Sequence, residues 1–319
     1  MTTVFRSIGG SLLAVILLLA TAGCLKSPPG EQREAADNWI LDTGFERGAM
    51  VFQPIPGSAR VSGKLDFGRK LEGLKSEWIV SQWNSKSDIA KIAGKRDGTR
   101  YVYENAYKTL AVADDGTVTL GVDTGQEYAE PRSRPTDPWV HLYLEQRYKN
   151  PRSLKDGDGL RIRFDTRIAK SELLMAPEQY DPGLHAAIAV FYLIIGNSSG
   201  SGDFLNFCVP IYDNRHGIPP GEWHIDSGFN PAGDTHKLIY TLDGGEIYDS
   251  PTGDGQWHHV DVDLKPHIER ALEIAKQNGY FGGVPHPDLG LEAIYIGWEV
   301  PGAFRSEMQI KNMAIGSSS

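Results

Sequence analysis

Short segments in which apolar and polar residues alternate recur from residue 59 to the end of the chain. Such alternation is typical of β-strands that bury one face, because successive side chains of a strand point to opposite sides of the sheet. Segments 59–67, 77–83, 99–112 and 117–122 show this pattern, and Asp114-Asp115-Gly116 predicts a hairpin turn. The chain also contains 36 Gly and 19 Pro, which favour turns. We therefore expect many short strands.

The rest of the chain fits an all-β fold with one helix. The later strand candidates are residues 140–144, 160–164, 186–195, 204–212, 236–242, 257–264, 291–300 and 306–315. A helix is predicted at 266–278, because Pro266 suits a first turn, an apolar stripe follows and Gly279 can end it. Neither β-α-β alternation nor a long repeat is visible. The pattern predicts a single β-sandwich domain over residues 38–319, made of two antiparallel sheets in a jelly-roll-like arrangement.

The N-terminal segment reads as an export signal. Residues 1–23 carry one charge, Arg6, followed by an apolar run at 12–20 that is shorter than the roughly 20 residues of a membrane-spanning helix. Ala22-Gly23-Cys24 resembles the end of a lipobox, which predicts lipidation of Cys24 and anchoring to the bacterial cell envelope. The alternative is ordinary cleavage after Ala20-Thr21-Ala22. Residues 24–37 are polar and rich in Pro, as expected of a flexible tether.

Charge and cysteine content narrow the choice of partners. The formal net charge of −9 argues against a nucleic-acid partner, which requires a basic surface. The chain has two cysteines, and one of them stands at the cleavage site. Cys208 then has no disulfide partner, and its neighbours Phe207 and Val209 are apolar. We expect a buried structural thiol there rather than a nucleophile.

The segment 137–148 holds the most informative side chains. On a strand, Val140, Leu142 and Leu144 would share the core face. The opposite face would then carry Trp139, His141, Tyr143, Glu145 and Arg147. Aromatic rings next to hydrogen-bonding groups suit sugar rings, since the apolar faces of sugars stack on aromatic rings while their hydroxyls pair with polar groups. The strand therefore predicts a carbohydrate-binding face.

The next strand presents Arg161, Arg163, Asp165 and Arg167 in the same alternating way. Three arginines on one face would suit the carboxylate or sulfate of an acidic sugar. The alternative interpretation is a cross-strand, salt-bridged face in which Glu145 pairs with these arginines.

A second polar and aromatic cluster follows the strand at 204–212. It contains Asp213, Arg215, Trp223 and His224, in a region where a binding loop would be expected. An exposed Trp223 would offer a platform for sugar stacking. The alternative is a turn in which Asp213 and Asn214 cap backbone groups and Arg215 pairs with an acid.

Metal and cofactor signals are weak. His259, Asp261 and Asp263 would share one face of a strand, but no metal-binding spacing is present. We predict no cofactor and no metal, with calcium held by loop carboxylates as the alternative.

Two catalytic alternatives use the same face. Glu145 and Glu299 would be the acid–base pair of a glycoside hydrolase. A polysaccharide lyase would instead use Tyr143 or His141 as the base, with Arg147 or Gln146 neutralising a sugar carboxylate. Motifs of hydrolase-fold esterases, P-loop enzymes and dinucleotide-binding domains are not found.

The chain resembles the β-jelly-roll lipoproteins and carbohydrate-binding modules of bacterial polysaccharide-degrading systems. The likeness rests on Ala22-Gly23-Cys24, on the strand from Trp139 to Arg147, and on the closing segments 294–299 and 308–312. It implies a fold and a ligand class, without assigning catalytic residues. The leading hypothesis is an envelope-anchored protein that binds a polysaccharide or oligosaccharide, acidic ones included, without cleaving it. A glycoside hydrolase or lyase and a structural envelope lipoprotein are the alternatives.

Overall fold

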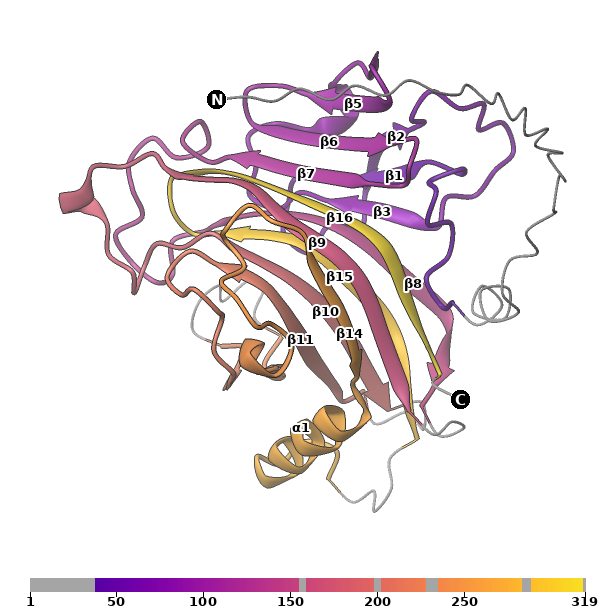
Figure 1. The fold of residues 1–319 in the computed structure, drawn as a ribbon, viewed down its shortest axis with the longest axis vertical. Helices are drawn as coiled ribbons and strands as arrows, with labels where there is room; N and C mark the ends of the chain where they lie inside the picture. The colour runs from indigo at the N-terminus through magenta and orange to yellow at the C-terminus, as the bar shows by residue number, and fades with distance from the viewer. Residues whose placement is uncertain (1–37, 155–158, 198–201, 228–234, 283–287, 318–319) are drawn as a thin grey trace, which may run out of the picture. The chain divides into compact units, whose positions relative to one another are not determined.

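Two β-sheets packed face to face form the protein in the computed structural model, which describes residues 38–154, 159–197, 202–227, 235–282 and 288–317 (Figure 1). The nine-stranded sheet has the order β12-β13-β11-β10-β15-β8-β3-β1-β2, and the seven-stranded sheet has the order β14-β9-β16-β7-β6-β5-β4. Most neighbouring strands are antiparallel, whereas β1 with β3 and β11 with β13 are parallel. The predicted two-sheet sandwich is confirmed.

The strands of the nine-stranded sheet are β1 (Ala49–Phe52), β2 (Val61–Leu65), β3 (Trp78–Ser81), β8 (Val140–Ser153), β10 (Ile188–Asn197), β11 (Phe204–Asp213), β12 (Glu222–Ile225), β13 (Leu238–Thr241) and β15 (Leu289–Val300). Those of the seven-stranded sheet are β4 (Lys95–Asp97), β5 (Arg100–Glu104), β6 (Lys108–Ala113), β7 (Val118–Asp123), β9 (Leu160–Leu173), β14 (His258–Asp263) and β16 (Phe304–Ser317). The helix α1 spans Lys265–Gln277, and 3-10 turns lie at Ile89–Lys91, Pro177–Gln179 and Gly244–Glu246.

The core lies between the two sheets. Leu142 and Leu144 of β8 are buried there, as their alternation predicts. Phe164 of β9 and Phe191 of β10 bring their rings within 5.5 Å of each other across the sheets. Trp298 of β15 is fully buried and donates a hydrogen bond to the carbonyl of Leu120 on β7 at 2.9 Å. Burying such large apolar side chains is the main favourable contribution to folding.

The helix and most strands lie close to the predicted segments, but β8 and β9 each extend nine residues beyond the predicted 140–144 and 160–164, and one segment is divided differently. The helix prediction is confirmed to within a residue, with Pro266 in the first turn and Gly279 beyond the end at a φ of +87°. The segment 99–112, predicted as one strand, is a hairpin of β5 and β6. The amide oxygen of Asn105 accepts bonds from the backbone N–H of Tyr107 and Lys108 and so stabilises the turn. Strands β1, β4 and β12 were not predicted.

Residues 37–319 cluster as one compact unit. The predicted signal segment, Cys24 and the tether lie outside the described residues. Within the described residues, no helix has the length and apolar character to span a membrane.

Candidate functional site

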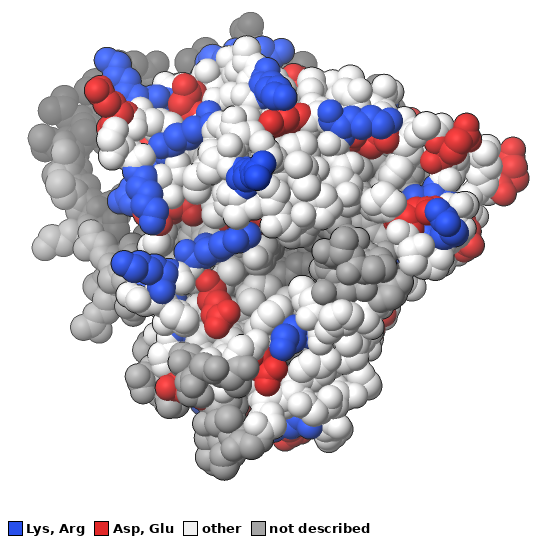
Figure 2. All heavy atoms as spheres, turned by 180° about the vertical axis from the view of Figure 1, so that it is seen from behind, with Lys and Arg blue, Asp and Glu red and all other residues white. Residues whose placement is uncertain are grey.

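The outer face of the nine-stranded sheet is hollowed into a cleft of about 860 Å³. Figure 2 views the molecule from this side, where uncharged residues separate groups of charged side chains. Six adjacent strands, β12, β13, β11, β10, β15 and β8, contribute to the cleft. Because strand side chains alternate, every second residue of these strands faces the cleft while its neighbours enter the core. The cleft residues discussed below are Trp83, Trp139, His141, Tyr143, Arg147, Tyr192, Asn206, Cys208, Asp213, Arg215, Glu222, His224, Glu292, Tyr295 and Glu299.

Aromatic rings form a continuous cluster at the β8 side of the cleft. The ring of Trp83 lies 5.3 Å from that of His141 and 5.8 Å from that of Tyr143, between ring centroids. Tyr143 in turn lies 6.0 Å from Tyr295 of β15 in an edge-to-face arrangement. Trp139 is 6.0 Å from His141. These separations are typical of mutually stabilising ring pairs, so the wall that they form is held in place before any ligand binds.

A carboxyl group lies on the cleft floor beside these rings. Glu299 of β15 is opposite His141 in the strand register, and the hydroxyl of Tyr143 donates a hydrogen bond to its Oε1. The hydroxyl of Tyr192 also bonds to this carboxyl. Burial raises the pKa of Glu299, and the two tyrosine bonds partly offset that rise. Burial also raises the pKa of both tyrosines, so their hydroxyls remain donors at neutral pH.

His141 is neutral and both of its ring nitrogens are occupied. Burial lowers the pKa of His141 to about 3. Its Nε2 accepts a hydrogen bond from Nε1 of Trp139 at 2.6 Å, and its Nδ1 lies 3.1 Å from the carbonyl oxygen of Trp139. Because both ring nitrogens already have partners, His141 is poorly suited to act as the base of a polysaccharide lyase. Gln146 is also engaged, because its amide exchanges two hydrogen bonds with the backbone of Leu41 on the core side.

Glu145 is not a surface residue of this face. Its side chain is fully buried, and its Oε2 accepts bonds from Arg147 Nε at 3.1 Å and Nη2 at 2.8 Å. Arg147 lies above it, about half exposed, and also contacts the hydroxyl of Tyr295. Burial raises the pKa of Glu145 and the guanidinium opposes that rise. Glu145 therefore positions Arg147 at the cleft and does not itself line it.

The backbone positions of Glu145 and Glu299 are well separated on the sheet, and Glu145 does not line the cleft. Glu145 is opposite Tyr295 in the register of β8 and β15, and Tyr295 is four residues from Glu299. At roughly 3.4 Å per residue their positions are about 14 Å apart along the strand. The carboxyl groups of glycoside hydrolases are about 5–9.5 Å apart. The pairing of these two residues as acid and base is not supported.

The second predicted cluster is split between the cleft and the opposite face. Asp213 and Arg215 line the cleft and form a two-point ion pair, with Nη2 to Oδ2 at 2.6 Å and Nε to Oδ1 at 2.9 Å. His224 lines the cleft from β12. Trp223 is 48% exposed but lies opposite Tyr240, whose ring stacks on Phe207 on the core side of the sheet. The expectation that Trp223 sits in a loop was wrong, because residues 222–225 form an edge strand.

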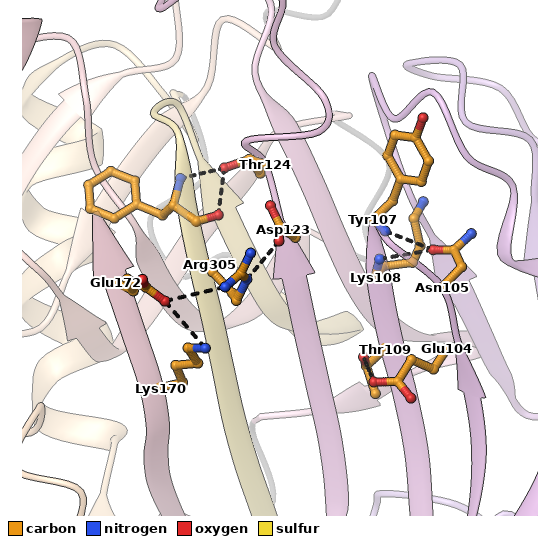
Figure 3. Close-up of polar contacts among 11 residues, drawn as sticks. Glu104, Asn105, Tyr107, Lys108, Thr109, Asp123, Thr124, Lys170, Glu172 and Arg305 are labelled. Atoms are coloured by element: carbon orange, nitrogen blue, oxygen red, sulfur yellow. Dashed lines mark hydrogen bonds and ion pairs between the residues drawn. The ribbon is translucent and has the colours of Figure 1, made fainter. Parts of the chain in front are cut away.

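Arg161 and Arg163 do not join the cleft. They lie on β9 of the seven-stranded sheet, and both face Asp261 of β14. The outer face of that sheet carries further ion pairs across strands, such as Arg305 between Glu172 and Asp123 (Figure 3). The interpretation as a salt-bridged face therefore fits, with Asp261 rather than Glu145 as the acid. Exposed pairs of this kind contribute roughly 0–1 kcal/mol each.

Within the described residues, no group of three or more His, Cys, Asp or Glu side chains is placed to hold a metal ion. The three residues considered from the sequence have protein partners instead. His259 contacts Asp165, Asp261 contacts Arg161, and Asp263 accepts from the backbone N–H of Leu160 and Lys265.

Several cleft residues were not predicted, and the alternation on two strands could have found some of them. Tyr295 alternates with the core residues Ile294 and Ile296 on β15. Tyr192 is a polar interruption of the apolar strand β10. Cys208 is buried, as predicted, but in the cleft floor rather than between the sheets. Trp83 follows a four-residue strand, and no local pattern indicates where its ring points.

No family model matches this chain, and no curated protein matches it. Similar solved structures include a family 12 xyloglucanase from Bacillus licheniformis, with 9% identity, a TM-score of 0.41 and coverage of 75% of this chain and 100% of the other. The xyloglucanase domain of the effector NopAA from Sinorhizobium fredii, in complex with cellobiose, has 12% identity, a TM-score of 0.37 and coverage of 73% and 100%. A variant of the Cel12A cellulase of Rhodothermus marinus has 12% identity, a TM-score of 0.38 and coverage of 75% and 98%.

Proposed function

We propose that this protein binds a polysaccharide or oligosaccharide chain along the cleft of the nine-stranded sheet. The observation that carries the proposal is the ring cluster of Trp83, His141, Tyr143 and Tyr295 beside the carboxyl of Glu299. The partly exposed rings of Trp83, His141 and Tyr295 offer apolar faces to sugar rings, and the buried ring of Tyr143 supports them. The carboxyl, the amide of Asn206 and the guanidinium of Arg147 offer partners to hydroxyls.

The dimensions of the cleft favour a chain over a single sugar. Six strands are separated by five spacings of roughly 4.8 Å, so the lined face is about 24 Å across. The volume of about 860 Å³ is near the upper end of ordinary ligand sites. A ligand that contacts both Trp83 at one side and His224 of β12 at the other must extend across the six strands that line the cleft.

Calorimetric titration with oligosaccharides, guided by a glycan array, tests the proposal. We expect Trp83→Ala to weaken binding at least tenfold, because the residue supplies a stacking surface and also supports His141 and Tyr143. Trp257→Ala is the matched control, since Trp257 is 39% exposed next to β14 of the other sheet. Equal losses in both variants, or no binding to any glycan by the intact protein, would contradict the proposal.

Glycoside hydrolysis is the second candidate function. The observation that favours it is the position of the Glu299 carboxyl in the cleft. A carboxyl with a raised pKa in a cleft is suited to protonate a leaving group. The partner would be Asp213, because Ile188 of β10 pairs with Glu299 on one side and Asp213 on the other. Two strand spacings put their Cα atoms about 10 Å apart. Release of reducing ends that stops in Glu299→Gln and continues in Glu145→Gln would establish hydrolysis, whereas an intact glycan after prolonged incubation would exclude it.

We also propose that the protein is exported and anchored to the bacterial envelope through a lipid on Cys24. The support is the signal-like segment and the Ala22-Gly23-Cys24 sequence that ends it. Mass spectrometry of the mature N-terminus tests this proposal. A diacylated Cys24 is expected, and a chain that begins at Gly23 with a free amine would contradict it.

A further inference from the structure

The charges that face the cleft are predominantly acidic. The acidic residues of the lining are Asp137, Asp213, Glu222, Asp226, Glu292 and Glu299, and the basic ones are Arg147, Lys149 and Arg215. A ligand that fills this space meets these groups at short range, where solvent screens charges less than at an open surface.

Both arginines are already neutralised by the protein. Arg147 is paired with the buried Glu145, and Arg215 is held by both oxygens of Asp213. Glu222 also lies near enough to Arg215 to interact with its charge. A ligand carboxylate or sulfate would have to compete with these acids for the guanidinium groups. The one other basic residue of the described lining, Lys149, is exposed near the end of the β8 portion of the cleft.

Two of the carboxyl groups have no ion-pair partner among the residues that the structure describes. Within the described part of the chain, no Lys or Arg forms an ion pair with Glu292 or Glu299. The carboxyl of Glu299 is bonded by the hydroxyls of Tyr143 and Tyr192. The carboxyl of Glu292 packs against the backbone of Gly196 in the neighbouring strand. Burial raises the pKa of both carboxyl groups, and the bonds from Tyr143 and Tyr192 oppose that rise in Glu299.

We infer that the cleft prefers glycans with free amino groups to neutral glycans and rejects glycans with carboxylate or sulfate groups. The inference rests on the proposed carbohydrate-binding function and adds the ligand class. A sugar ammonium group bound at either carboxyl would supply the cation that Glu292 or Glu299 lacks, and charge-assisted hydrogen bonds are roughly twice as strong as neutral ones. Neutral hydroxyls would bond to the same carboxyl groups less strongly. Anionic groups would be placed among like charges.

The inference replaces the sequence-based expectation of an acidic ligand. That expectation used Arg161, Arg163 and Arg167 of β9, which lies in the other sheet. Arg161 and Arg163 are paired with Asp261, and Arg167 donates a hydrogen bond to Gln309. The arginines that do face the cleft have acidic partners of their own.

Titration with amino, neutral and uronic-acid oligosaccharides, matched in linkage and length, tests the inference at low and at high salt. At low salt we expect the amino series to bind about fivefold to tenfold more tightly than the neutral series, and the uronic series to bind most weakly. The preference for the amino series should shrink at high salt and in Glu292→Gln. The control variant Glu178→Gln changes an exposed acid outside the cleft and should keep the preference for the amino series.

The outcomes separate this inference from the proposed function. Equal or tighter binding of the uronic series, or tighter binding of the neutral series than of the amino series, would overturn the charge preference and leave the proposed function standing. Absence of binding in all three series would overturn the proposed function itself. An amino preference that is unchanged in Glu292→Gln and in Glu299→Gln would overturn the assignment to these two residues.

Discussion

Removal of the guanidinium from Arg147 should destabilise the protein in a manner that depends on pH. Arg147 is the ion-pair partner of Glu145, whose side chain is fully buried. Breaking a buried pair by removing one partner typically costs 3–5 kcal/mol, since an uncompensated buried charge remains. Arg147 is about half exposed, and part of its contribution is therefore screened by solvent. We expect Arg147→Met to lower the free energy of unfolding by about 2 kcal/mol at pH 7.

The direction of the pH dependence follows from the pKa of Glu145. Burial already raises this pKa and Arg147 lowers it, so the variant should raise it further. A carboxyl with a higher pKa in the folded state binds more protons there than in the unfolded state. The destabilisation caused by the buried carboxyl of Glu145 therefore grows as pH rises above the glutamate pKa of the unfolded state, near 4.3, and is absent below that pH. The difference in unfolding free energy between the parent and Arg147→Met should therefore become smaller as pH falls from 7 to 4.5.

Urea unfolding of the parent, Arg147→Met and the double variant Glu145→Gln/Arg147→Met at several pH values measures these effects. The double variant should recover part of the lost stability at pH 7, because a neutral amide is cheaper to bury than an unpaired carboxylate. An equal loss of unfolding free energy at pH 4.5 and pH 7, or a double variant less stable than the single one, would contradict the assigned role of the Glu145–Arg147 pair.

Three further predictions concern stability and ligand binding. Burial lowers the pKa of Lys108 from 10.5 to about 8, so above pH 8 the unfolded state binds more protons than the folded state. The free energy of unfolding of the parent should therefore rise by about 2 kcal/mol from pH 7.5 to 9.5 relative to that of Lys108→Met. The exposed Lys95→Met is the control. A Cβ at Gly297 would lie 2.0 Å from the carbonyl oxygen of Leu142, so Gly297→Ala should cost more than about 2 kcal/mol in urea unfolding, whereas Gly217→Ala should cost little. Tyr143→Phe removes a donor to Glu299 and should raise the pKa of that carboxyl, measured by NMR titration; an unchanged pKa would contradict the assigned bond.

The sequence predicts the fold better than the site, because alternation reports faces and not distances. It correctly places Leu142 and Leu144 in the core and His141 and Tyr143 on the other side of β8. It cannot report how deep a residue lies on that face. Glu145 has the correct parity but is buried under Arg147, two residues further along the same strand.

The main errors in the site arise from connections between strands. β8 and β9 are consecutive in the sequence, yet they belong to different sheets, so Arg161 and Arg163 lie far from the aromatic strand in the topology. Conversely, β15 lies beside β8 although about 140 residues separate them in the chain, and it supplies Tyr295 and Glu299. Strand order depends on the packing of the whole sandwich, and no local pattern encodes it. Trp223 was misplaced because a four-residue edge strand gives little alternation to read.

Carbohydrate binding in the cleft would be decided by a crystal structure of the protein with a bound oligosaccharide, obtained by soaking with the best ligand from the titrations. We expect sugar rings stacked on the wall formed by Trp83 and Tyr295, with hydroxyl or amino groups bonded to Glu299 and Glu292. A sugar bound instead at Trp257 on the seven-stranded sheet, with the cleft empty at saturating ligand, would contradict it.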